Sequence, residues 1–146
     1  MPKKTFKKVK PQKHPLVGKN IDFLQKHLIT GNYTIVLLSS KNCLHCLGAH
    51  NEVKNFLDKY KFNFISLIYE PNSEEVYTRK KYLDEDNKMP YIEQSFSTEI
   101  KDKHDLSIFP TFIFLGEDGA VIEFTATLKR VEYLLESSNE FKRNIS

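Results

Sequence analysis

Hydrophobic residues of this chain fall into short continuous runs that are separated by charged segments. Such runs, bounded by turn residues, are typical of strands that are buried on both faces of a sheet. Glycines in the turn after the third run suit a two-strand hairpin, because they adopt positive φ at little cost. We therefore predict strands at residues 35–38, 62–68, 112–115 and 121–124, with a hairpin turn at 116–119.

Between these runs, apolar residues recur at three- and four-residue steps, which is the period of an amphipathic helix. The spacing predicts helices at residues 21–28, 47–60 and 128–135. The charged segment 73–105 carries weaker stripes, which predict two further helices separated by residues 87–90. The resulting order is a βαβ unit followed by a ββα unit, an α/β arrangement around a central sheet.

Both cysteines of the chain lie in Cys43-Leu44-His45-Cys46, directly after the first apolar run and before a predicted helix. Free N–H groups and positive potential at a helix N-terminus favour a thiolate on the first sulfur. The thiolate is the reacting form of cysteine. We predict a redox pair in which Cys43, at or just before the first turn, attacks, and Cys46, one turn deeper, resolves the mixed disulfide.

The second half of the site comes from Phe109-Pro110-Thr111, which leads into the third apolar run. With the order of elements and the Cys-x-x-Cys pair, this segment resembles the thioredoxin fold over residues 20–137. In that family the proline is cis and lies against the disulfide, and the backbone of the preceding residue pairs with the substrate chain. The resemblance implies a central mixed sheet flanked by helices, a helical insertion before the cis-proline strand, and substrate binding by Phe109 and Pro110.

The chain departs from ordinary thioredoxins at several positions of the motif. Asn42 stands where that family has tryptophan, and Leu44-His45 replaces Gly-Pro between the cysteines. Leu37 matches the position of a buried aspartate that assists proton transfer to the resolving thiol in ordinary thioredoxins. These differences argue against a general reductant that is served by thioredoxin reductase.

His45 is similar to the histidine between the cysteines of the oxidising DsbA-type enzymes, although Leu44 replaces the proline usual there. An imidazole beside the Cys43 thiolate stabilises the reduced form and so raises the reduction potential. We expect Asn42, Leu44 and His45 to tune the pair, and the protein to be more oxidising than ordinary thioredoxin. The resemblance leaves the subfamily open between DsbA-like, TlpA/ResA-like and bacteriocin-transport-accessory-like proteins.

The leading prediction is a thiol-disulfide oxidoreductase that exchanges its Cys43–Cys46 pair with protein thiols or disulfides and with an unidentified redox partner. This chemistry requires no cofactor and no metal. The alternative is a thioredoxin-fold binding module without redox turnover, which captures a peptide, or zinc or copper(I) through Cys43, Cys46 and His45 or His50. Cys46 and His50 share a helical face, but such a compact group rarely completes a tetrahedron alone.

Charge is divided unevenly along the 146 residues. Residues 1–19 hold seven lysines and no acidic residue, whereas the remainder holds 15 basic and 19 acidic residues. We predict a flexible basic tail at residues 1–19 and one thioredoxin-like domain at residues 20–146. The tail is a candidate contact for an anionic surface. Nucleic acid is not an expected partner, because Phe6 is the sole aromatic residue of the tail.

No apolar run approaches the roughly 18 residues that a membrane span requires, and the N-terminus lacks the apolar core of a secretory signal. We therefore expect no transmembrane segment. The expected location is cytoplasmic for the sequence as written, and extracytoplasmic if a leader has been removed.

Overall fold

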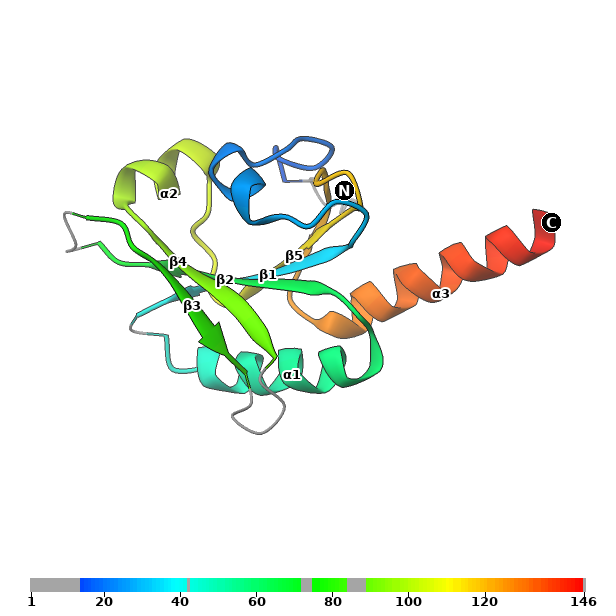
Figure 1. Cartoon of the computed structure of the whole chain (residues 1–146). Helices are drawn as coiled ribbons and strands as arrows, with labels where there is room; N and C mark the ends of the chain where they lie inside the picture. Colours follow the sequence, from blue (N-terminus) through cyan, green and yellow to red (C-terminus); the bar gives the residue numbers. More distant parts are fainter. Residues whose placement is uncertain (1–13, 42, 72–74, 84–88, 146) are drawn as a thin grey trace, which may run out of the picture.

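The computed structural model describes residues 14–41, 43–71, 75–83 and 89–145, with side chains as far as residue 137. This part of the chain folds into a six-stranded mixed sheet with helices on both faces (Figure 1). The strand order is β3-β4-β2-β1-β5-β6. In chain order the elements are η1 (Asp22–His27), β1 (Thr34–Ser40), α1 (Cys46–Lys59), β2 (Asn63–Tyr69), β3 (Thr78–Tyr82), β4 (Pro90–Phe96), α2 (Thr98–His104), β5 (Thr111–Leu115), β6 (Val121–Thr125) and α3 (Leu128–Ile145).

Strands β4, β2 and β1 run parallel to one another, while β3 is antiparallel to β4, β5 to β1 and β6 to β5. Helix α1 and the first turns of α3 cover one face of the sheet, and η1 and α2 cover the other (Figure 1). Strand β1 shows why its sequence is continuously apolar. Ile35 and Leu37 pack under α1, whereas Val36 and Leu38 pack under η1, so both faces are buried.

The predicted mixed sheet flanked by helices is confirmed. The apolar runs form β1, β2, β5 and β6, and the helical stripes form η1, α1 and α3. The hairpin turn is also confirmed: the N–H of Gly119, at φ +85°, donates to the carbonyl of Gly116 at 2.9 Å. Among the described helices, none combines the length and the apolar character needed to cross a membrane.

The prediction of two helices in segment 73–105 is wrong for its first part. Residues 78–82 form the edge strand β3, and residues 90–96 form the strand β4. Every residue of β3 is exposed, so it carries no apolar alternation to mark it as a strand. Strand β4 buries Glu93, Gln94 and Ser95, which hides its apolar pattern. Among the described residues, the helical insertion before Pro110 is therefore α2 alone.

Part of the predicted tail contacts the domain. The ring of His14 stacks on Phe124 at 3.7 Å, and Val17 forms a bridge with Val121 of β6. His14 Nε2 also lies 2.9 Å from the carbonyl oxygen of Asp105. Residues 1–13 of the predicted tail lie outside the described residues.

Candidate functional site

Cys43 and Cys46 are joined by a disulfide at the end of β1, with their Cα atoms 5.5 Å apart. The connection from β1 to α1 is fixed by backbone hydrogen bonds. The N–H of Lys41 donates to the Tyr69 carbonyl at 3.3 Å, and that of Cys43 donates to the Ser40 carbonyl at 3.1 Å. These bonds hold the first sulfur at the carboxyl edge of the parallel strands.

Helix α1 begins at Cys46 itself, so Cys43 precedes the first turn as predicted. The second sulfur, however, lies at the start of the helix and not one turn deeper. The first intrahelical bond runs from the Ala49 N–H to the His45 carbonyl at 3.3 Å. The amides of residues 46–48 therefore lie ahead of that bond, where N–H groups and the helix dipole favour negative charge.

The two sulfur-bearing residues differ in exposure. Cys46 is 7% exposed and belongs to the buried stripe of α1, whereas Cys43 is only half-buried. A half-buried first cysteine and a covered second one suit an attacking and a resolving thiol. His45 is exposed at the N-cap of α1 and makes no capping hydrogen bond with its side chain. Asn42, the remaining predicted tuning residue, lies outside the described residues.

The Phe109-Pro110 segment reaches the same edge of the sheet through β5. Thr111 pairs with Leu38 near the end of β1. In this antiparallel register, Pro110 comes next to the end of β1, which leads into the segment that carries Cys43. The Phe109–Pro110 peptide bond is cis. The Thr111 hydroxyl donates to the Ile108 carbonyl at 2.7 Å and fixes the turn before the strand. Residues about 65 apart in the sequence are thus brought together.

Tyr69, at the end of β2, supports this segment, and no motif of the sequence singles it out. Its ring stacks on Phe109 with centroids 5.8 Å apart, and its hydroxyl lies 2.8 Å from Thr98 Oγ1. Lys101 Nζ lies 5.4 Å from the centre of the same ring. The place of Tyr69 at the carboxyl end of a buried strand was the signal that could have found it.

Large apolar side chains are exposed around the disulfide. Leu44, between the cysteines, is 92% exposed, Leu47 is 76% exposed, and Ile108, just before Phe109, is 75% exposed. We call these three side chains the apolar rim. Exposed side chains of this size next to a reactive group are typical of a surface that a partner covers.

A cation near Cys43 has a partner of its own. Lys41 Nζ lies 3.8 Å from Oε1 of Glu70, which is mostly buried at the end of β2. An exposed pair at this distance is weak.

His50, one turn after Cys46 on α1, is half-buried between rings of the sheet. Its ring centroid lies 6.0 Å from that of Phe64 and 6.2 Å from that of Tyr91. Burial lowers the pKa of His50, while Glu93 acts to raise it and Lys81 lowers it further. The imidazole is therefore uncharged at neutral pH.

The described residues contain no group of three or more His, Cys, Asp or Glu side chains arranged to hold a metal ion. The disulfide also occupies both sulfurs. The metal-capture form of the alternative therefore finds no ligand set in the described part of the chain.

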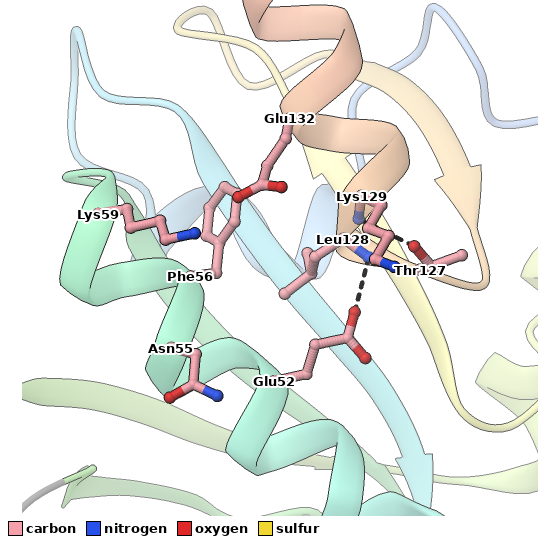
Figure 2. A pocket seen from close by; sticks show the side chains of 8 residues that line it. All are labelled: Glu52, Asn55, Phe56, Lys59, Thr127, Leu128, Lys129 and Glu132. Carbon is pink, nitrogen blue, oxygen red and sulfur yellow. Dashed lines mark hydrogen bonds between the residues drawn. The ribbon is translucent and has the colours of Figure 1, made fainter.

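A separate pocket of about 380 Å³ lies between the later half of α1 and the start of α3 (Figure 2). Phe56 and Leu128 contribute apolar surface to it. Glu52 Oε2 accepts a hydrogen bond from the Leu128 N–H at 2.8 Å, and Thr127 Oγ1 accepts one from the Lys129 N–H at 2.9 Å. These polar groups cap the N-terminus of α3, so their role is structural.

Comparison with known proteins gives matches among solved structures. No protein-family model and no curated protein matches the sequence. A thioredoxin-like protein from Aeropyrum pernix matches with a TM-score of 0.55 and 13% identity, over 75% of this chain and 79% of that one. A second thioredoxin-like protein, solved in solution in its oxidized form, matches with a TM-score of 0.53 and 22% identity, over 77% and 83% of the two chains. At these identities the likeness concerns the fold.

Proposed function

We propose that this chain, which has the thioredoxin-like fold, is a thiol-disulfide oxidoreductase that acts on proteins through Cys43 and Cys46. The observation that carries the proposal is the Cys43–Cys46 disulfide at the start of α1, on the sheet edge where the Phe109–Pro110 segment also arrives. A pair of thiols in this position can exchange two electrons without any bound cofactor.

In the reducing direction, the Cys43 thiolate attacks one sulfur of a substrate disulfide and releases the other as a thiolate. Cys46 then loses its proton and attacks Sγ of Cys43. The internal disulfide forms, the second substrate sulfur leaves as a thiolate, and the pair has lost the two electrons that the substrate gained. The oxidising direction is the same sequence reversed, beginning with a substrate thiolate that attacks Cys43.

Protein substrates fit the surface around the pair. Phe109 and Pro110 are proposed to hold the substrate chain, with the Phe109 ring supported by Tyr69. The apolar rim, which flanks the disulfide from both the Cys-x-x-Cys segment and the segment before β5, favours substrates with apolar residues beside the reacting cysteine.

The proposed reduction potential of the Cys43–Cys46 pair is higher than that of ordinary thioredoxin, so the pair is the stronger oxidant. Leu37 is fully buried and apolar, and His45 lies at the N-cap beside the helix N-terminus. A cationic or hydrogen-bonding imidazole at that place stabilises the reduced pair, and about 30 mV corresponds to roughly 1.4 kcal/mol. An unidentified redox partner would restore the oxidised or reduced form after each turnover.

Trapping of mixed disulfides tests the reaction. The Cys46→Ser variant keeps the attacking thiol and should accumulate mixed disulfides with protein substrates. The matched Cys43→Ser variant should accumulate none and should lose all thiol exchange. A pair of variants that trap equally, or a wild-type protein without exchange activity, would refute the proposal and favour a binding module.

Titration of the pair in glutathione buffers, with quantification by thiol alkylation, tests the poise. We expect a potential above that of thioredoxin, which is about −270 mV. The His45→Ala variant should have a lower potential than the wild type. A wild-type potential at or below the thioredoxin value would contradict the oxidising form of the proposal and leave the exchange reaction itself standing.

A further inference from the structure

The resolving step of the proposed exchange needs a base beside Cys46. A thiol attacks a disulfide only after it has lost its proton. Burial in apolar surroundings disfavours the thiolate. Cys46 is 7% exposed and lies in the stripe of α1 that contains Ala49 and Val53. Bulk water is therefore a poor proton acceptor for this sulfur.

His50 lies four residues after Cys46 on the same side of α1. Residues at this spacing are neighbours on a helix, with Cβ atoms roughly 5–6 Å apart. Long side chains in a helix also lean toward its N-terminus, over the residue four positions earlier. His50 is thus a base one helical turn from Cys46, and its ring lies against Phe64 and Tyr91 on the sheet.

A buried polar row crosses the sheet beneath this part of α1. Strand register pairs Leu37 with Ser66, and Ser66 with Glu93. The Ser66 hydroxyl is fully buried and has no hydrogen-bond partner among the described residues. Glu93 is 6% exposed, and its Oε1 lies 3.2 Å from Lys81 Nζ. A buried hydroxyl without a hydrogen-bond partner lowers the stability of the fold. The position of the Ser66 hydroxyl beside the buried Glu93 carboxylate therefore indicates a polar function for this part of the sheet.

The titratable and charged groups that face His50 come from two strands of the sheet. They are Tyr91 and Glu93 on β4 and Lys81 on β3, while Cys46 lies four residues earlier on the helix that carries His50 itself. Burial lowers the pKa of His50, the negative charge of Glu93 partly restores it, and Lys81 lowers it again. An uncharged imidazole is a proton acceptor, and the nearby carboxylate stabilises the imidazolium that forms.

We propose that His50 is a catalytic base that takes the proton of Cys46 in the resolving step, with Glu93 as a positioning residue behind it. The inference rests on the proposed function. His50 accepts the Cys46 proton, the Cys46 thiolate attacks Cys43 Sγ, and the bond from Cys43 to the substrate sulfur breaks. The substrate leaves as a thiolate and the imidazolium returns its proton to that sulfur or to water. Two electrons pass from the protein thiols to the substrate.

Reduced protein mixed rapidly with one equivalent of Ellman's reagent separates the two attacks. The first release of nitrothiobenzoate reports Cys43, and the second reports Cys46 attacking the mixed disulfide. In the His50→Gln variant we expect the second phase to slow by about 100-fold at pH 7, since a positioned base contributes roughly 10²–10⁴-fold. The first phase should match that of the wild type. The matched control His104→Gln, on α2, should change neither phase.

The pH profile of the second phase gives an independent readout on the unmodified protein. Its rate should reach a plateau near neutral pH, because a histidine base is deprotonated above about pH 6.5. In His50→Gln the rate should continue to rise with pH through about 8.5, the ordinary pKa of a thiol. The Glu93→Gln variant should shift the midpoint to lower pH, because the carboxylate raises the pKa of His50. A role of Glu93 in packing alone would leave this midpoint in place.

A second phase that slows by less than about tenfold in His50→Gln, or that slows together with the first phase, would overturn the inference. So would a wild-type profile that rises through pH 8.5 without a plateau. These outcomes leave the first phase of the wild-type protein intact and with it the proposed function. Absence of the first phase in the wild type would refute both.

Discussion

Replacing Glu52 with alanine removes a hydrogen bond that ties helix α1 to the start of α3. The Glu52 carboxylate accepts a hydrogen bond from the Leu128 N–H at 2.8 Å, in a partly buried place (Figure 2). A hydrogen bond to a charged group contributes about 1.5–3 kcal/mol, and a carboxylate at a helix N-terminus contributes about 0.3–1 kcal/mol. Alanine gains slightly in helix propensity. We expect Glu52→Ala to lower the free energy of unfolding by about 2 kcal/mol.

Glu52→Gln keeps an acceptor oxygen but removes the charge, so its expected loss is about 1 kcal/mol. The matched control is Asn55→Ala, which alters an exposed residue on the same helix and in the same pocket. Its expected change is within about 0.5 kcal/mol. Urea unfolding followed by circular dichroism, with linear extrapolation, measures all three variants. Equal losses in Glu52→Ala and Asn55→Ala would refute the role assigned to the carboxylate.

Gly119→Ala should destabilise by about 1–2 kcal/mol, because φ is +85° and a Cβ would come 2.7 Å from Leu28 Cδ1. A Cβ at Gly48 in α1 meets no atom within 4 Å, so Gly48→Ala should stabilise by up to about 1 kcal/mol. Urea midpoints of the two variants that shift in the same direction would contradict these two predictions. Burial, followed by the charges of Glu93 and Glu70, raises the pKa of Tyr77 to about 12. Its contribution to stability is therefore present below the unfolded value of about 10 and is lost as pH rises through about 12. Alkaline titration of tyrosinate absorbance should show one ring that ionises late and that is missing in Tyr77→Phe. Identical titration curves of the wild type and Tyr77→Phe would contradict the raised pKa of Tyr77. Deleting residues 1–13 should abolish binding to anionic vesicles at low salt, measured by sedimentation with neutral vesicles as control. Unchanged sedimentation of the truncated chain would remove the tail as an anionic-surface contact.

The sequence predicted correctly those elements whose buried residues are apolar and form a clear pattern along the chain. Strand β1 is buried on both faces and reads as a continuous apolar run. Helix α1 presents one stripe that includes Val53 and Phe56. In both cases the side chains that decide the packing are apolar, so the pattern of hydrophobicity and the pattern of burial coincide.

Strands β3 and β4 were not predicted, because the pattern of hydrophobicity does not match the pattern of burial in these two strands. The edge strand β3 packs no apolar residue and carries basic side chains, a common protection of free edges. In β4 the buried positions include Glu93, whose charge is met by Lys81 from the neighbouring strand. The sequence does not show such a pairing, because it depends on the register between two strands.

The same distinction applies to the candidate site. Cys43 and Cys46 are close in sequence, and the Phe109–Pro110 segment was recognisable beside them through the resemblance to a known fold. Tyr69 and His50 are marked as candidates by their neighbours on other elements. Tyr69 acquires its place through stacking on Phe109, and His50 through the buried row on the sheet. Their residue types alone gave no such information.

The strand order has a consequence for the growing chain on the ribosome. The cysteines follow β1, but the antiparallel neighbour of β1 is β5, which is made after β2, β3 and β4. Synthesis proceeds at roughly 5–20 residues per second. For several seconds the nascent chain therefore presents two cysteines beside a strand with one edge unpaired and without the Phe109–Pro110 segment. Closure of that edge by β5 completes the candidate site, so a chain arrested before residue 111 carries the two thiols without the Phe109–Pro110 segment in place beside them.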